Sequence, residues 1–289
     1  MPSGNLSRYT NKEQQSTILF NDICIPMDSI LSQILDDKRN MLETEVKPHV
    51  TIQDFQQRPL YSRPTLSLRS ALTRSDHGII SEFKRKSPSK GWIHADADPL
   101  EVIPAYDRNG AAAVSILTDT PYFGGEPSFI EEVRPHVHCP ILRKEFIIDE
   151  LQIHEAKAIG ADAILLIASA LPVDTLRRFI LLAHEISLEV LLEVHNLEEL
   201  NATLNLGADV YGVNNRNLRT FVTDVSVSEV LARHFTEETV HISESGISHP
   251  DTVIHLRKLG YRGFLMGENF MKQNHPGEAL QQFISQLRK

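Results

Sequence analysis

The sequence predicts an α/β fold, a (β/α)8 barrel with an N-terminal helical extension. From Gly78 onward, short apolar runs alternate with longer amphipathic ones, as parallel strands separated by helices would require. In addition, Gly110, Gly160, Gly207 and Gly260 each end a helical pattern just before a strand, at intervals of about 50 residues that hold two strand–helix units each. This rhythm fits a closed barrel better than an open doubly wound sheet, which commonly has about five or six strands.

The chain ahead of the barrel shows helical periodicity. Ile30–Glu45 has the apolar spacing of a helix, and Ile52–Gln57 forms a second segment that ends before Arg58-Pro59. We expect residues 28–75 to form one or two helices that pack against the barrel across its mouth, the end where the strands finish. Residues 1–27 are predicted to be a flexible N-terminal extension, and residues 28–289 a single barrel domain that includes these helices.

Eight short apolar runs are the expected barrel strands. They are Ile79–Phe83, Ala112–Leu117, Pro140–Arg143, Ala163–Ile167, Glu189–Glu193, Val210–Val213, Val240–Ser243 and Gly263–Met266. The helical patterns between them are Leu100–Asn109, Ile148–Ile159, Val173–Glu185, Leu197–Leu206 and Thr252–Leu259. In such barrels the carboxyl ends of the strands face the active site, so the polar residues at these ends are the candidate functional residues.

The composition narrows the class of protein. With 289 residues and 41% hydrophobic content the chain can build a large core, and a net charge of −9 argues against a nucleic-acid-binding surface. Cys24 and Cys139 are far apart without a Cys-x-x-Cys pattern, which favours a reduced, cytoplasmic protein. No window approaches the roughly 20 apolar residues of a membrane span, and the polar N-terminus is unlike a signal peptide. The 13 histidines show no metal-ligand spacing, so we expect no metal.

Charged residues end the first, third and fifth barrel strands. Because side chains alternate across a strand, Glu82 and Lys84 share a face and would be neighbours at the mouth. Each could tune the other's proton affinity, although a structural ion pair is the alternative. Lys144, after strand three, is either a solvated loop residue or a proton donor. Glu193 ends strand five, and a buried carboxylate there needs a cationic partner, for which Lys84 and Lys144 are the candidates.

Strands six to eight end in groups suited to hold a polar substrate. Asn214, Asn215 and Arg216 follow strand six, where amides and a guanidinium could bind hydroxyls or a carboxylate, although a plain turn is a serious alternative for Asn215. Strand seven runs into Ser243-Glu-Ser-Gly-Ile247 and strand eight into Leu265-Met-Gly-Glu268. Loops at these two places commonly hold a phosphate through backbone N–H groups, so we expect a phosphate site there.

The loop after strand two carries two aromatic residues beside two glycines. Tyr122 and Phe123 precede Gly124-Gly125. This pattern suggests a mobile loop that closes apolar surface over a ring of the substrate. Packing against a neighbouring loop is the alternative.

These strand ends belong to seven longer motifs. They are Glu82-Phe-Lys-Arg-Lys-Ser-Pro-Ser89, Tyr122-Phe-Gly-Gly125, Leu142-Arg-Lys-Glu-Phe146, Gly160-Ala-Asp-Ala-Ile-Leu-Leu166, Leu192-Glu-Val-His195, Val213-Asn-Asn-Arg-Asn-Leu218 and Ser243-Glu-Ser-Gly-Ile247. Together they resemble the indole-3-glycerol-phosphate synthase family, from about residue 28 to 289. Each motif alone is weak, whereas the set is specific.

The resemblance implies a cofactor-independent carboxy-lyase of tryptophan biosynthesis. Its substrate would be 1-(2-carboxyphenylamino)-1-deoxyribulose 5-phosphate, and its products indole-3-glycerol phosphate, carbon dioxide and water. We therefore expect a small-molecule sugar-phosphate substrate, no cofactor, no nucleic acid and no membrane, and a cytoplasmic monomer or weak homodimer.

The resemblance also implies roles for single residues. Lys144 would protonate the carbonyl oxygen, and Lys84 would bind the anthranilate carboxylate or act as the acid for the loss of water. Glu193 would stabilise cationic intermediates, and Glu82 would orient the lysines or serve as the base. The other implied contacts are Asn214 and Ser245 to substrate hydroxyls and the glutamates, Ser87, Gly246, Gly267 and the N–H of Glu268 to the phosphate, and Phe123, Phe146, Arg216 and Leu218 to the ring.

Two other functions are weighed against this one. Phosphoribosylanthranilate isomerase is a barrel that typically uses a Cys/Asp pair, and Cys139 precedes strand three, where it could not serve. A non-catalytic relative that only binds a phosphorylated ligand should have lost Lys84, Lys144 or Glu193, and the chain keeps all three.

Overall fold

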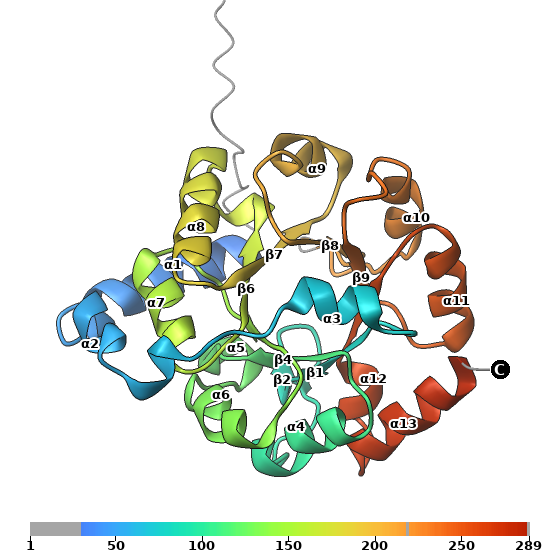
Figure 1. Ribbon diagram of the computed structural model, residues 1–289, viewed down its shortest axis with the longest axis horizontal. Coiled ribbons are helices and arrows are strands. Elements are labelled where there is room, and N and C mark those ends of the chain that lie inside the picture. The colour runs from blue at the N-terminus through green and yellow to red at the C-terminus, as the bar shows by residue number, and fades with distance from the viewer. Residues whose placement is uncertain (1–29, 218–219, 288–289) are drawn as a thin grey trace, which may run out of the picture.

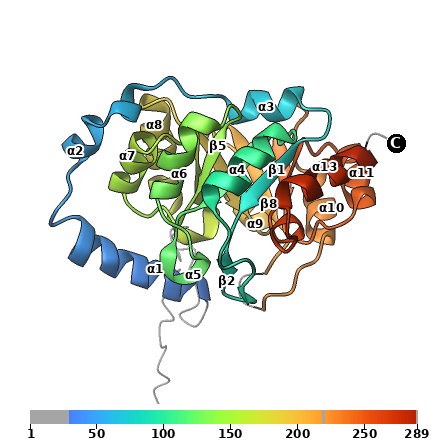
Figure 2. The same ribbon diagram turned by 90° about the horizontal axis from the view of Figure 1, so that it is seen from below.

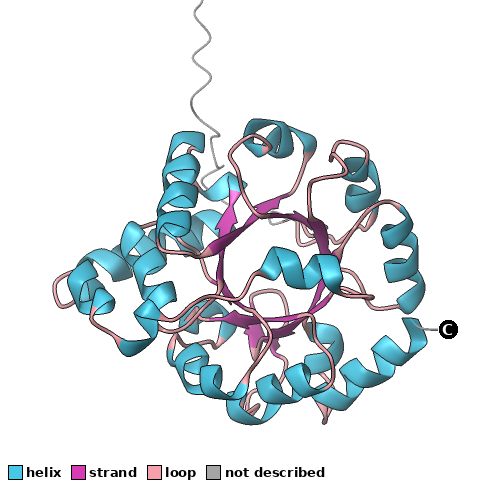
Figure 3. Cartoon of the chain, in the orientation of Figure 1, coloured by secondary structure: helices cyan, strands magenta, loops and turns pink. Residues whose placement is uncertain are grey.

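The computed structural model describes residues 30–217 and 220–287 and contains a closed eight-stranded parallel barrel (Figures 1 and 3). Its strands are β1 Ile79–Phe83, β4 Ala113–Leu117, β5 Ile141–Lys144, β6 Ala163–Ile167, β7 Glu189–Val194, β8 Val210–Asn214, β9 His241–Glu244 and β10 Gly263–Met266. The first strand, β1, pairs with both β4 and β10, which closes the barrel. The predicted (β/α)8 class, a TIM barrel, is therefore confirmed.

Helices surround the barrel as an outer ring (Figure 3). They are α4 Pro99–Arg108, α6 Ser128–Val133, α7 Glu150–Ala158, α8 Val173–Glu185, α9 Leu197–Thr203, α10 Ser226–Ala232, α11 Pro250–Lys258 and α13 Pro276–Leu287, with the short α5 Thr120–Phe123 and α12 Glu268–Met271 after β4 and β10. Local signals explain several boundaries, because Asp98 caps α4 ahead of Pro99, and Asp149 forms a capping box with Gln152 at α7. The strand and helix predictions agree with these bounds to within a few residues.

The N-terminal segment differs from its prediction. It contains three α-helices, α1 Ile30–Met41, α2 Ile52–Gln56 and α3 Leu68–Arg74, where one or two were expected. Figure 2 shows α1 and α3 at opposite ends of the barrel. Only α1 lies at the mouth. The third helix closes the other end, since its Leu68 and Leu72 are buried inside the barrel core. The predicted extension of residues 1–27 lies outside the described residues.

Alternate residues of each strand point into the barrel. The inward apolar layer includes Ile80, Leu142, Leu165, Leu191, Val210 and Ile242, all within one buried cluster, while their neighbours pack outward against the helices. Two residues further along β1, β5, β7 and β9, and four residues further along β8, the same inward face reaches the mouth. This register turns Glu82, Lys144, Glu193, Asn214 and Glu244 toward one another.

A two-residue hairpin follows β1 at the mouth. Its strands, β2 Lys86–Ser87 and β3 Gly91–Trp92, pair antiparallel. The Arg85 Nε, just before β2, donates to the Gly124 carbonyl at 2.8 Å, and Lys86 lies over the Trp92 ring. The bond from Arg85 thereby attaches the hairpin to Gly124, the residue that follows α5 and its Phe123.

Candidate active site

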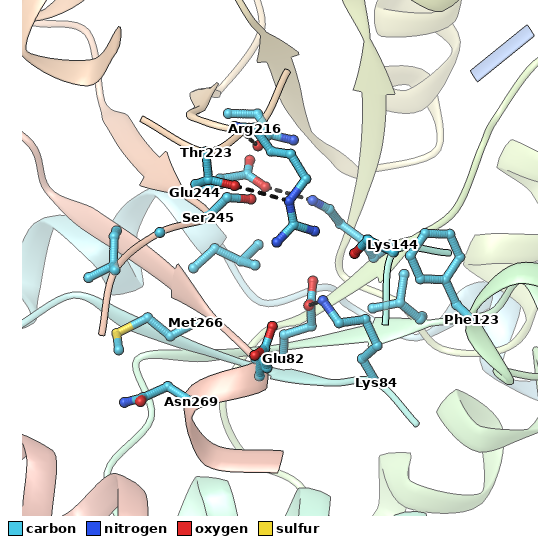
Figure 4. A pocket seen from close by; sticks show the side chains of 18 of the residues that line it. Glu82, Lys84, Phe123, Lys144, Arg216, Thr223, Glu244, Ser245, Met266 and Asn269 are labelled. Atoms are coloured by element: carbon cyan, nitrogen blue, oxygen red, sulfur yellow. Dashed lines mark hydrogen bonds and ion pairs between the residues drawn. The ribbon is translucent and has the colours of Figure 1, made fainter. Parts of the chain in front are cut away.

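A cavity of about 470 Å³ opens at the carboxyl ends of the barrel strands (Figure 4). Its lining includes the predicted residues Glu82, Lys84, Phe123, Lys144, Phe146, Glu193, Asn214, Arg216, Ser245, Gly246, Gly267 and Glu268. Residues that are far apart in the chain therefore meet in one place. This space is the mouth cavity.

Lys144 lies at the centre of the charged groups of the mouth cavity. Its Nζ is 2.6 Å from Glu244 Oε2 and 3.1 Å from Glu193 Oε2. Burial of the side chain would lower its pKa, but the carboxylates of Glu244, Glu193 and Glu82 outweigh burial and raise it. Lys144 is therefore an ammonium ion at neutral pH and carries a proton when substrate arrives.

Glu82 and Lys84 form a second ion pair on β1. Lys84 Nζ donates to Glu82 Oε1 at 2.5 Å (Figure 4). Burial opposes ionisation of Glu82, but Lys84 and then Lys144 overcome it and lower the pKa of the carboxyl. The predicted sharing of one strand face is confirmed, and the lysine side chain, 14% exposed, lines the cavity.

The two glutamates that flank Lys144 have different surroundings. Glu193 accepts from Lys144 on one oxygen and from Asn214 Nδ2 at 3.1 Å on the other, whereas Glu244 Oε1 is buried without a hydrogen-bond partner. Burial alone would raise the pKa of Glu193, but Lys144 and His195 lower it. Burial, only partly offset by Lys144, raises the pKa of Glu244 to about 7. Two neighbouring carboxyl groups whose pKa values differ in this way are typical of acid–base sites.

Two glycines make room for the buried carboxylates. A Cβ at Gly212 would lie 2.2 Å from Glu244 Oε1, and a Cβ at Gly267 would lie 2.6 Å from Glu82 Oε1. Both distances are far below van der Waals contact, so any side chain at either position would displace a carboxylate. Gly267, predicted to be a phosphate contact, therefore has this second task.

One end of the mouth cavity is polar and flanked by lysines. Gly246, Gly267 and Glu268, the expected phosphate contacts, are among its lining residues, together with Lys90 and Lys272, which sequence reasoning missed. Lys90 Nζ lies 2.5 Å from Glu268 Oε1 and neutralises that carboxylate.

Two predicted substrate contacts at the edges of the cavity have a different outcome. Ser87 is buried within the β2–β3 hairpin and is not among the lining residues, whereas Ser89 and Lys90 of the same hairpin are. Leu218 lies outside the described residues. Asn215 is also buried, and its amide donates to Ser243 Oγ and the Ser245 carbonyl, so it holds the loops after β8 and β9 together.

The opposite end of the cavity is aromatic. The rings of Phe123 and Phe146 lie with centroids 5.9 Å apart, and Leu117 and Ile167 also line the cavity. Arg216 reaches across the opening, where its Nε donates to Thr223 Oγ1 at 3.3 Å (Figure 4). This end can hold a flat ring, with a guanidinium at its edge.

Sequence reasoning also missed Glu244. It was read only as part of the loop motif after strand seven, although alternation gave a usable signal. Ile242 faces the inner core, so Glu244 must face inward as well. Among the described residues, no group of three or more His, Cys, Asp or Glu side chains is arranged to hold a metal ion.

Comparisons with known proteins agree on one family. The family model described as indole-3-glycerol phosphate synthase matches residues 31–283. The indole-3-glycerol phosphate synthase of Bacteroides thetaiotaomicron is 49% identical over 261 residues, which cover 90% of this chain and 100% of the relative. That of Salinibacter ruber is 40% identical over 263 residues, or 90% and 97% of the two chains.

Solved structures confirm the fold. A mutant tryptophan synthase alpha-subunit from Pyrococcus furiosus superposes with a TM-score of 0.57 at 17% identity, covering 74% of this chain and 98% of its own. At that identity the likeness concerns the barrel alone. Since the family model and the relatives span most of the sequence, the chain belongs to the indole-3-glycerol phosphate synthase family.

Proposed function

We propose that the mouth cavity binds the anthranilate ring of the substrate against Phe123 and Phe146 and its phosphate near Gly246 and Gly267, with Lys144 as the central acid. The activity is that of the family, a carboxy-lyase step of tryptophan biosynthesis that acts on a sugar phosphate. The observation that carries the proposal is the buried Lys144 ammonium, held by two carboxylates between an aromatic and a polar end.

Ring closure joins a carbon of the anthranilate ring to the carbonyl carbon of the sugar. Negative charge grows on the carbonyl oxygen, and Lys144 donates its proton there. Its raised pKa is compatible with this step, because an alkoxide is far more basic than an amine. Glu193 and Glu244 hold the ammonium in place until the oxygen accepts the proton.

The closed ring carries positive charge, which the carboxylates of Glu82, Glu193 and Glu244 can stabilise in a site with little water. The bond to the substrate carboxylate then breaks, and its electron pair returns to the ring as carbon dioxide leaves. The ring itself is the electron sink for this step.

Loss of water needs an acid for the departing hydroxyl and a base for a proton on carbon. Lys84 lines the cavity beside Glu82 and is the proposed acid, with Lys144 as the alternative. The family resemblance gave Glu82 one of two roles, to orient the lysines or to serve as the base. The pKa of Glu82 is lowered, however, whereas that of Glu244 is about 7, which suits a group that exchanges protons near neutral pH. We therefore propose Glu244 as the base.

The remaining proposed properties are the location and the oligomeric state of the protein. No helix among the described residues is long and apolar enough to cross a membrane. We keep the cytoplasmic location and the monomeric or weakly dimeric state as proposals. The acidic net charge is consistent with a protein that does not bind nucleic acid.

The test is turnover of carboxyphenylamino-deoxyribulose phosphate, followed by the fluorescence of indole-glycerol phosphate, with and without a chelator. Wild type should turn over in both, and Lys144→Ala should lose at least about a hundredfold in kcat, since a positioned acid contributes about 10²–10⁴-fold. Lys157→Ala is the matched control, because Lys157 is also buried but donates to the Arg63 carbonyl away from the cavity. Turnover that survives in folded Lys144→Ala would refute the acid assignment.

A further inference from the structure

A half-buried histidine contacts one of the glutamates of the mouth cavity from outside the cavity lining. His195 follows β7, its side chain is 12% exposed, and it does not line the cavity. Its Nε2 is 3.3 Å from Glu193 Oε1, an ion-pair distance, yet the geometry does not make a hydrogen bond. The contact is therefore mainly one of charge, and it reaches the substrate only through Glu193.

A second carboxylate holds the other side of the histidine ring. Glu199, in the first turn of α9, accepts from His195 Nδ1 at 3.2 Å and from the His195 backbone N–H at 2.8 Å. Its other oxygen accepts from Asn196 Nδ2 at 2.7 Å. Glu199 is thus fixed by three donors, and the imidazole lies between two glutamates, an arrangement that favours the doubly protonated ring.

The charge on His195 matters for the balance of the site. The groups that face the ring are Glu193 from β7 and Glu199 from α9, and through Glu193 it is linked to Lys144 and Glu244. Burial would lower the pKa of His195, but the carboxylates of Glu193 and Glu199 on either side of the ring raise it to about 10. On the far side of Lys144, Glu244 accepts from that lysine through Oε2, and its buried Oε1 has no hydrogen-bond partner among the described residues.

We propose that His195, held by Glu199, is a positioning residue that keeps Glu193 ionised and so makes Glu244 the member of the glutamate pair that exchanges protons. This inference rests on the proposed function and deepens it, because it explains why two glutamates on the same lysine differ. Without the imidazolium, Glu193 and Glu244 would compete for one proton, and the base would be present in only part of the molecules.

The test is the pH dependence of kcat and KM for His195→Gln. Glutamine can still donate an N–H toward Glu193 but carries no charge. Glu193 then protonates at higher pH, so the acidic limb of the kcat profile should move upward by about one pH unit or more. KM should change by less than about twofold, because His195 lies outside the cavity.

Glu199→Gln should move the same limb in the same direction by a smaller amount, because His195 then keeps only one carboxylate. His255→Gln is the matched control. That histidine pairs with Glu229 at 2.9 Å on the surface, and its loss should leave the profile unchanged. A lower kcat with an unmoved acidic limb in His195→Gln would overturn the proposal, since a purely structural role predicts that result.

A readout without substrate separates this inference from the proposed function. The ring signals of His195, assigned by their absence from His195→Gln, should keep their imidazolium shifts through neutral pH in an NMR titration of the full chain. Titration near 6.5, the ordinary value of histidine, would overturn the inference even if turnover is found. Imidazolium shifts in a protein without turnover would refute the proposed function alone.

Discussion

At the residue scale, the catalytic assignments depend on the different surroundings of the two glutamates that contact Lys144. Both glutamates contact the same ammonium, but only Glu193 also receives an amide and an imidazole. The consequence is a low pKa on one side and a pKa of about 7 on the other. A shared cation does not make two carboxylates equivalent, because the remaining lone pairs decide how each is stabilised.

Replacing Glu244 by Gln tests this asymmetry. The amide keeps the size of the side chain but cannot take up a proton, so kcat should fall by about 10²-fold or more while KM stays within a few-fold. Any inflection of kcat near pH 7 should disappear with it. Steady-state kinetics from about pH 5 to about pH 9 would check this.

The comparison variant for this measurement is Glu229→Gln, on the exposed face of α10, which should behave as wild type. If Glu244→Gln kept wild-type kcat throughout that range, Glu82 would return as the base.

At the element scale, one lysine attaches the N-terminal helix to the mouth. Lys38 of α1 lies 2.8 Å from Asp119 Oδ2 and 3.0 Å from Glu145 Oε1, and all three side chains are buried. Asp119 caps the short α5 that ends in Phe123, and Glu145 separates Lys144 from Phe146. Helix α1 therefore supports both aromatic walls of the cavity from outside.

Lys38→Met should consequently destabilise the protein. Asp119 would remain buried without this cation, and Glu145 would keep only Arg143, at 4.0 Å, as a cation among the described residues. Removal of one partner from a buried ion pair typically costs about 3–5 kcal/mol in the free energy of unfolding. Denaturant unfolding measures this difference. Arg39→Ala removes the neighbouring, exposed pair with Asp36 and should cost less than about 1 kcal/mol. Equal effects of the two variants would mean that α1 does not depend on the buried pair.

At the scale of the whole molecule, barrel closure explains why strand ends far apart in sequence share one cavity. Lys144 is 49 residues from Glu193 and 100 from Glu244. Glu193 and Glu244 lie on β7 and β9, and neither strand is a neighbour of β5, which carries Lys144. Lys144 therefore reaches both carboxylates across the barrel interior. Folding therefore assembles the charges only when the ring is complete, so their pKa shifts report on global stability.

Stability should consequently depend on pH on both sides of neutrality. Glu244 and His195 have raised pKa values in the folded protein, so unfolding releases their protons. The free energy of unfolding therefore falls as pH rises. The fall due to Glu244 lies between about pH 4.5 and 7, and the fall due to His195 lies between about pH 6.5 and 10. Glu82 and Glu193 have lowered values, so their contribution is present above about 4.5 and lost below it.

Denaturant titrations of wild type and His195→Gln from about pH 6 to about pH 10 would measure the fall in the free energy of unfolding at alkaline pH. The variant should show the smaller fall in this range, because glutamine has no proton to lose. An equal fall in both proteins would assign the alkaline loss to other groups.

The sequence by itself determined the order of the elements, the fold class and most of the mouth residues. The alternation of side chains along strands and glycine at the helix ends are local properties. They can therefore be read from the sequence without knowing which residues are neighbours in space. For the same reason Glu82 and Lys84 could be paired in advance, since they are two residues apart on one strand.

Tertiary structure decided what depends on distant partners. Sequence reasoning did not predict α6, α10 or α13, and it could not place α3 at the closed end, because packing against the barrel selects these positions. It also left Glu244 without a role. Gly212 leaves space for that carboxylate, while Lys144 and His195 lower the pKa of the neighbouring Glu193. Pairing, burial and proton affinity are properties of neighbours in space, and only the closed barrel supplies those neighbours.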